Sequence, residues 1–130
     1  MDIVKSRNAE KLLGPILQFD NRIRTVTVIG PMGEPFASVE RPGLTSLEPS
    51  SVTSRFFKRT ALAGLMGGNE DRYHGRTKVV IAMREKLTLV CLMVSDRIIL
   101  ISAEPTFPLS RVGKLGELVD QLNLESLASL

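Results

Sequence analysis

The alternation of apolar and polar residues predicts a chain built from both strands and helices. Residues 22–30 are rich in β-branched side chains and predict a strand, which a turn at residues 31–35 connects to a returning strand at residues 36–40. Short polar segments typical of tight antiparallel hairpins separate the strands expected further along the chain. These strands are predicted at residues 77–83, 87–94 and 97–103.

Two outer helices flank the strands, one at residues 4–18 and one from Pro108 to about Leu122. Each gathers its apolar side chains near one side at helical spacing. Pro15 lies within the first helix, and we expect a kink or an early end there because proline lacks a backbone donor. The predicted apolar face of the last helix consists of Val112, Leu115, Val119 and Leu122.

A middle helix is predicted between Ser50 or Ser51, either of which can cap it, and about Met66. Two consecutive glycines supply its stop. The polar residues 69–75 are then expected to form a loop. The resulting order of elements is α-β-β-α-β-β-β-α.

The strand at residues 87–94 is apolar on both faces, so helices are expected to cover both faces of the sheet. The predicted fold class is therefore α/β (α+β), with a five-stranded antiparallel sheet sandwiched between helices. We expect one domain over residues 1–130, with a core at about residues 5–122 and a C-terminal tail at residues 123–130.

The middle helix carries two apolar stripes, one through Val52, Phe56 and Ala63 and the other through Phe57, Ala61 and Leu65. One stripe packs on the sheet of its own chain, and the other is exposed, covered by the preceding loop, or buried against another molecule. Self-association is favoured because small residues in the helix permit close approach, and symmetric homodimers are the commonest oligomers. The predicted interface residues are Arg55, Phe56, Phe57, Lys58, Ala61, Gly64 and Leu65.

Composition narrows the setting of the protein. Cys91 is the one cysteine, so no internal disulfide forms, which favours a reducing compartment, and we expect a cytoplasmic protein. No signal peptide is visible, and the longest apolar stretches are far shorter than the ~20 residues that span a bilayer. The net charge of +3 permits an acidic partner without demanding one.

No catalytic constellation is found, and the sequence predicts no enzyme, cofactor or metal. Gly30–Gly33 follows a strand but lacks the Gly-Lys-Ser/Thr of a phosphate-binding loop. His74 is the one histidine; a metal site with the acids beside it is conceivable, but a surface position is favoured. Cys91 is interpreted as a small core residue. Three isolated acids near strand ends are interpreted as turn caps: Asp20, Asp96 and Glu104.

A basic and aromatic segment precedes the third predicted strand. Arg72, Tyr73, Arg76 and Lys78 form a possible patch for nucleic acid, in which Tyr73 would stack on a base. Against this, the sequence has no signature of a known nucleic-acid-binding fold, and aromatic residues make up only 5% of the chain. A solvated surface is favoured.

The order of elements resembles the roadblock/dynein light chain domains, within the wider roadblock/longin/profilin-like group. The segment RTKVVIAMREKLTLVCLMVSDRIILISAE, residues 76–104, is similar to small archaeal roadblock-like proteins of unknown function. Arg84-Glu85 at a hairpin tip and residues 102–105 (SAEP) carry the likeness. The resemblance implies a non-enzymatic homodimer with the middle helix and a sheet edge at its interface, and partners such as a small GTPase or a larger regulatory assembly.

The first function hypothesis is therefore a non-enzymatic, homodimeric protein-interaction or regulatory module. A scaffold associated with a small GTPase is one form that such a module can take. The alternative is a small-molecule-binding sensory domain, which an enclosed pocket with a few convergent polar groups would favour. Nucleic-acid binding ranks third, and salt-dependent affinity for DNA or RNA would identify it.

Overall fold

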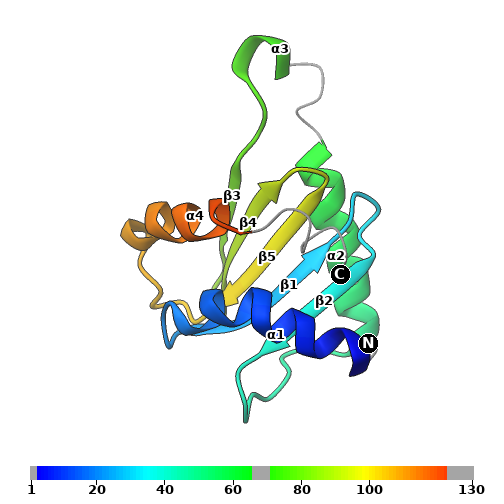
Figure 1. Ribbon diagram of the computed structural model, residues 1–130, viewed down its shortest axis with the longest axis vertical. Helices are drawn as coiled ribbons and strands as arrows, with labels where there is room; N and C mark the ends of the chain where they lie inside the picture. Colours follow the sequence, from blue (N-terminus) through cyan, green and yellow to red (C-terminus); the bar gives the residue numbers. More distant parts are fainter. Residues whose placement is uncertain (1–2, 66–70, 123–130) are drawn as a thin grey trace.

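The computed structural model describes the backbone of residues 3–65 and 71–122 and the side chains of residues 8–62 and 71–122. The order of elements follows the sequence prediction, with a short extra helix before the third strand (Figure 1). The elements are α1 (Ile3–Gln18), β1 (Ile23–Ile29), β2 (Pro35–Glu40), α2 (Ser50–Leu65), α3 (Asp71–His74), β3 (Val79–Met83), β4 (Thr88–Val94), β5 (Arg97–Ala103), a 3-10 turn (Leu109–Arg111) and α4 (Val112–Asp120).

The strands form one antiparallel sheet in the order β2-β1-β5-β4-β3. The hairpins β1–β2, β3–β4 and β4–β5 connect neighbours in sequence. The central pair, β1 with β5, joins the two halves of the chain and places Val26 opposite Ile101 and Val28 opposite Ile99. β2 and β3 are consequently the two edges of the sheet.

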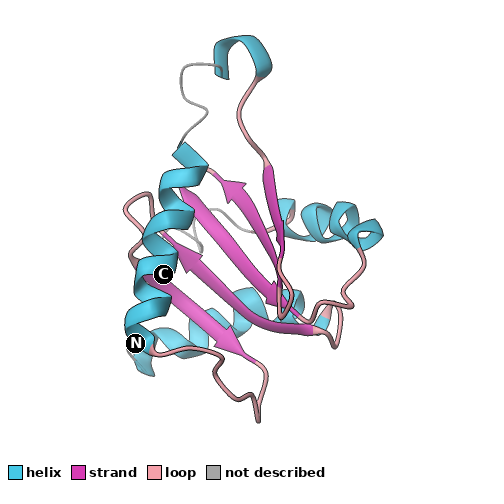
Figure 2. Cartoon of the chain, turned by 180° about the vertical axis from the view of Figure 1, so that it is seen from behind, coloured by secondary structure: helices cyan, strands magenta, loops and turns pink. Residues whose placement is uncertain are grey.

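Helices lie on both faces of the sheet, as predicted. α1 and α4 cover one face, and α2 crosses the other (Figures 1 and 2). The larger core lies under α1 and α4, where Leu13, Ile16 and Leu115 are fully buried against the sheet. Alternation along β5 divides its residues, because Ile99 and Ile101 enter this core while their neighbours face α2.

Two local predictions are corrected by the structure. Of the kink or early end expected at Pro15, the early end is wrong, because α1 continues to Gln18, the predicted last residue of the helix. Pro15 is exposed, so its ring points away from the core and water can satisfy the carbonyl that loses its partner. The segment predicted as a loop at residues 69–75 contains the one-turn helix α3. Its first residue, Asp71, places a negative charge at the positive end of the helix dipole, which stabilises the turn.

The boundaries of the other elements agree with the sequence to within a few residues. α2 begins at Ser50 itself, and the carbonyl of Pro49 accepts the first-turn amides of Val52 and Thr53. The last helix opens with the 3-10 turn, and its predicted face is buried at Val112 and two further residues.

Candidate functional site

The edge strand β3 is apolar and bare. All five of its residues are exposed, on both faces of the sheet, from 36% for Val80 to 67% for Met83. A sheet edge is normally protected by charge, proline or a covering element. Within the described chain β3 has no such protection, because its sequence is VVIAM and no described element covers it. Sequence reasoning missed this exposure, since an apolar strand is ordinarily a core strand.

The pairing register shows which backbone groups of β3 point away from the sheet. The N–H of Arg84 and the C=O of Lys78, one at each end of the strand, bond to the β4 side at 2.8 and 2.9 Å. Because bonded and non-bonded pairs alternate in an antiparallel ladder, every second residue between them also bonds to β4. The remaining residues direct their N–H and C=O groups outward, where the structure describes no partner: Val79, Ile81 and Met83.

α2 carries the residues expected at an interface. Phe56, Phe57 and Ala61 all contact one apolar cluster on the sheet, so the two predicted stripes face the same side of the helix. The phenylalanine rings lie 6.4 Å apart and are only partly buried, whereas Ala61 is fully buried. These residues therefore already contribute to the core of a single copy.

Over the part of α2 whose side chains the structure describes, residues 50–62, the outer side is polar except at Leu62. Arg55 and Lys58 are exposed, and Leu62 is 64% exposed one turn further along the helix. The side chains of Gly64 and Leu65, which complete the predicted interface, lie outside the described residues.

The β1–β2 turn fixes the position of α2. Gly33 in this turn has φ +82, and a Cβ there would lie 2.6 Å from the Cα of Lys58. The turn closes through the bond from Gly30 N to Glu34 O, at 2.9 Å. Backbone packs directly on backbone at this point, so one end of the hairpin and the middle of α2 move together.

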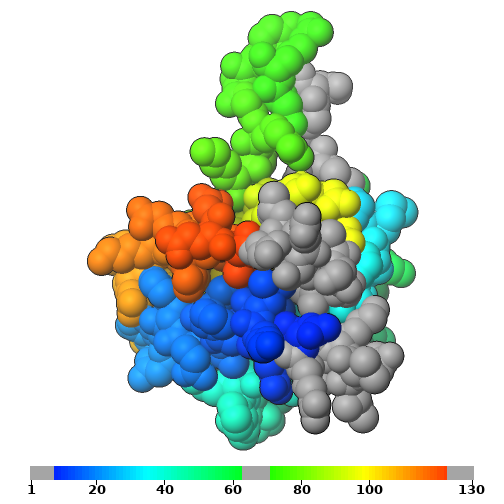
Figure 3. Space-filling model, viewed as in Figure 1, coloured from blue at the N-terminus to red at the C-terminus, as the bar shows by residue number. Residues whose placement is uncertain are grey.

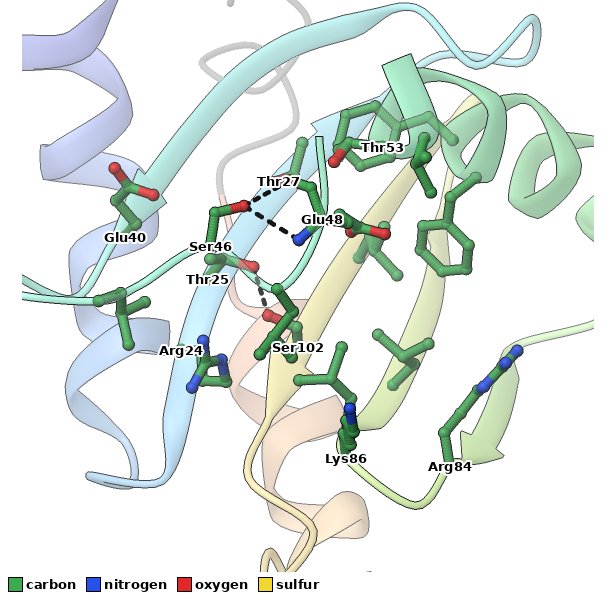
Figure 4. Close-up of a pocket in the computed structure, with 18 of the residues that line it drawn as sticks. Arg24, Thr25, Thr27, Glu40, Ser46, Glu48, Thr53, Arg84, Lys86 and Ser102 are labelled. Atoms are coloured by element: carbon green, nitrogen blue, oxygen red, sulfur yellow. Dashed lines mark hydrogen bonds between the residues drawn. The ribbon is translucent and has the colours of Figure 1, made fainter. Parts of the chain in front are cut away.

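A cleft of about 1090 Å³ lies between α2 and the sheet. The first half of α2 and the loop at residues 44–48 form one side of it, the strands form the floor, and the β3–β4 turn forms part of the rim (Figure 4). Its apolar wall includes Phe56, Phe57, Leu89 and Leu100. The cleft has the polar groups that the sensory alternative requires, but it is open to solvent rather than enclosed.

The floor of the cleft carries hydroxyl groups. Thr25 and Thr27 on β1 lie beside Ser102 on β5 and Ser38 on β2. The hydroxyls of Thr25 and Ser102 are 2.5 Å apart, and those of Thr27 and Ser38 are 2.9 Å apart. The sequence contained half of this signal, because threonine and valine alternate along β1, but the cross-strand register was needed for the rest.

Charged side chains surround the floor. Arg24 is held by Glu104 at 2.8 Å and donates to the carbonyl of Thr45 at 3.1 Å, which ties the loop over the sheet. Four other cations line the cleft and make no ion pair with any described residue: Arg55, Arg59, Arg84 and Lys86. Three acids also line it: Glu40, Glu48 and Glu85.

The predicted basic patch lies on an arm that projects from the body (Figure 3). Arg72, Tyr73, Arg76 and Lys78 are all exposed, on α3 and on the segment leading into β3. The guanidinium of Arg72 stacks over the Tyr73 ring at 4.8 Å and donates to its hydroxyl at 2.6 Å. Arg72 therefore occupies one face of the ring on which a base would stack.

The remaining candidates for chemistry have structural positions. His74 is exposed on α3. The described residues contain no cluster of three side chains that could ligate a metal. Cys91 is buried, and burial raises the pKa of its thiol to about 11, so the thiol stays protonated at neutral pH. No described helix is long and apolar enough to cross a bilayer.

The acids interpreted as turn caps make ion pairs as well. The Asp20 carboxylate accepts the backbone N–H of Arg22 at 2.8 Å, which is the predicted turn cap. It also pairs with the guanidinium groups of Arg22 and Arg111. Asp96 pairs with Arg97 in a solvent-exposed turn.

The sequence matches no protein-family model and no curated protein. Solved structures match over nearly the whole chain. The gliding protein MglB from Thermus thermophilus has a TM-score of 0.71 at 14% identity, over 96% of this chain and 95% of that chain. MglB in a tetrameric arrangement has a TM-score of 0.72 at 15% identity, over 97% and 95%.

A Roadblock/LC7 domain from Streptomyces avermitilis has a TM-score of 0.66 at 13% identity, over 92% of this chain and 94% of that chain. The structural match establishes the fold, whereas sequence identities this low leave the function open. The element order, the sheet topology and these structures agree: the chain has the roadblock fold.

Proposed function

We propose that this chain is a non-enzymatic interaction module that works as a symmetric homodimer, joined by pairing of β3 with β3 of a second copy. The observation that carries the proposal is the apolar edge of β3, whose outward backbone groups have no described partner. An unpaired apolar edge is a template for another strand. A structure of MglB, which shares the fold, has a tetrameric arrangement, and this supports the proposal that the present chain also associates with copies of itself.

The geometry of β3 suits pairing with itself. In an antiparallel pair centred on Ile81, that residue faces its own copy, and Val79 faces Met83. These are the residues whose N–H and C=O groups point outward, so the two edges would exchange about six hydrogen bonds. The apolar side chains of both strands would then cover one another on each face.

The helices α2 of the two copies would lie on the same face of the joined sheet. Arg55, Lys58 and Leu62 on the outer side of α2 are the described residues available to the second copy. The interface predicted on the middle helix is therefore kept as part of the proposal. Phe56 and Phe57, which are partly buried in one copy, would contribute the parts of their rings that remain exposed.

Light scattering tests the proposal directly. We expect the wild type to have twice the chain mass of 14.3 kDa and Ile81→Lys to be a folded monomer. In the dimer the two introduced charges would face each other, whereas in one copy the side chain at this position is 40% exposed and tolerates lysine. Leu109→Lys, at an exposed apolar position before α4, is the matched control and should remain a dimer.

Circular dichroism on the same samples confirms that each variant is folded, and Val79→Lys provides a second disruption of the same edge. A wild type that is monomeric at every concentration would overturn the proposal. A folded Ile81→Lys dimer would move the interface away from β3.

A small GTPase is the partner class that we propose for the dimer, following the resemblance seen in the sequence. Surface plasmon resonance of the immobilised dimer against small GTPases of the source cell, loaded with GDP or with a non-hydrolysable GTP analogue, measures this. Binding that depends on the nucleotide supports a regulatory role, and equal or absent binding of both forms argues against it.

A further inference from the structure

The floor of the cleft beneath α2 is polar where a helix-covered sheet face is ordinarily aliphatic. Thr27 is only 5% exposed, yet it presents a hydroxyl rather than a methyl-only side chain, and Thr25, Ser38 and Ser102 adjoin it. Buried polar groups are retained where they have partners. Among the described residues, the side-chain partners of these four hydroxyls are one another, across the strands.

Hydroxyl pairing leaves donors available. When one hydroxyl donates to another, the accepting hydroxyl keeps its own hydrogen free for a third group. Each of the pairs Thr25–Ser102 and Thr27–Ser38 therefore keeps one O–H that the other member does not accept. Thr25, Thr27 and Ser102 line the cleft (Figure 4). Two such donors on a rigid sheet suit an acceptor with several oxygens.

The rim adds positive charge at the same end of the cleft. Arg84 and Lys86 flank the β3–β4 turn, and β4 passes from this turn to Leu89, which lies opposite Ser102. Arg55 and Arg59 approach from α2. Counting Arg24, five cations and three acids line the cleft, so its net charge is positive. Arg24 is the cation already committed, to Glu104.

Apolar residues line the cleft directly beside the hydroxyl groups, since Leu100 lies opposite Thr27 and Leu89 lies opposite Ser102. Phe56 and Phe57 from α2 face Leu87, Leu89 and Leu100 from the sheet. A volume of about 1090 Å³ is at the upper end of the range for small-molecule sites. The cleft thus offers apolar surface for a ring or a short acyl chain next to hydroxyl donors and cations.

We propose that this cleft binds a small organic anion, with its apolar body against Phe56, Phe57 and Leu100 and its phosphate or carboxylate group on the hydroxyl floor and the rim cations. One chain supplies every lining residue. The site therefore needs no residue of a second copy, although it shares Phe56 and Phe57 with the proposed dimer interface. Ligand binding and solution mass are measured separately, so failure of one proposal is distinguished from failure of the other.

Nuclear magnetic resonance titration of the full chain tests the site, with adenosine monophosphate as the phosphate probe and octanoate as the carboxylate probe. We expect at least one probe to bind with a Kd of about 1 mM or tighter and to shift the amide signals of Thr25, Thr27 and Ser102. Binding of one probe alone assigns the head group, and binding of both supports a general organic-anion site.

Variants locate the contacts. The double variant Arg84→Gln/Lys86→Gln should weaken binding about tenfold and reduce its salt dependence. Thr27→Val, which keeps the shape and removes the hydroxyl, should weaken it about fivefold, and Thr27→Ser should restore it. Lys114→Gln on α4, away from the cleft, is the control and should leave binding unchanged.

Light scattering on the same samples reports the dimer separately. The proposal is overturned if neither probe shifts the cleft signals at about ten times the expected Kd, if the shifts fall on the α3 arm instead, or if the double variant binds as tightly as the control.

Discussion

At the scale of single residues, Asp20 accepts more hydrogen bonds than any other side chain in the described part of the protein. Its carboxylate is 2% exposed and pairs with Arg22 at 2.7 Å and with Arg111 at 2.6 Å. Those guanidinium groups lie over the rings of Phe107 and Phe19, respectively. One carboxylate therefore joins the end of α1, the start of β1 and the turn before α4.

We predict that Asp20→Asn lowers the free energy of unfolding by roughly 2–4 kcal/mol at pH 7, because removing one partner leaves part-buried cations uncompensated. Hydrogen bonds from Arg22, with help from the charge of Arg111, hold the pKa of the Asp20 carboxyl well below its usual range. Its stabilisation is thus complete above the unfolded pKa, at about pH 4, and is lost as the pH falls through the lowered folded value.

Urea unfolding at pH 7 and near pH 3 measures this, and the difference between wild type and Asp20→Asn should shrink at the lower pH. Asp96→Asn is the matched control, since its side chain is 71% exposed and its ion pair should contribute under about 1 kcal/mol. Equal losses in the two variants would show that burial of the Asp20 pair has no special weight.

At the scale of elements, the position of α2 depends on a turn from elsewhere in the chain. α2 leaves a large cleft above the sheet, so it has fewer apolar contacts than α1 or α4 to hold it. The contact of Gly33 with the backbone of Lys58 compensates for this at the middle of the helix.

We predict that Gly33→Ala destabilises the chain by about 3 kcal/mol or more, since the new methyl would force the turn and α2 apart. Gly43→Ala separates this effect from backbone strain. Gly43 also has a left-handed φ, +79, but a Cβ there meets nothing within 4 Å, so only the strain of about 1 kcal/mol should appear. Thermal unfolding compares the two, and a similar loss in both would argue that α2 tolerates the displacement.

The sequence predicted most of the elements, because periodicity and turn residues are local signals. It placed α1, β1, β5 and the face of α4 correctly. It did not predict that Phe56 and Phe57 share one side of α2, because that depends on how the helix is tilted over the sheet. The cleft was equally out of reach, since its hydroxyls come from three strands that only the register brings together.

At the scale of the whole molecule, the two sheet edges differ. β2 begins with Pro35 and ends with the charged Glu40, features that discourage another strand. β3 has neither. A molecule with one open apolar edge forms a closed pair when that edge meets its copy, whereas two open edges would continue into a fibre.

The seam between β1 and β5 joins segments that lie far apart in the sequence. The hydroxyls of Thr25 and Ser102 touch across it although they are 77 residues apart in sequence. Closing so long a loop is slow, so we predict that Val28→Ala, at the seam, slows refolding. Leu115→Ala on α4 should instead mainly speed unfolding, as stopped-flow kinetics would show. An unchanged refolding rate of Val28→Ala would show that β1 pairs with β5 only after the rate-limiting step of folding.

Until that seam closes, a newly made chain carries open edges on β1 and β5 as well as on β3. All of these offer the same backbone chemistry, and a neighbouring nascent chain competes for each of them. Internal closure removes two of the edges and leaves one. In the proposed dimer, recognition between copies would therefore depend on the order of events as well as on shape, because a chain that has completed its own sheet has one open strand left to pair.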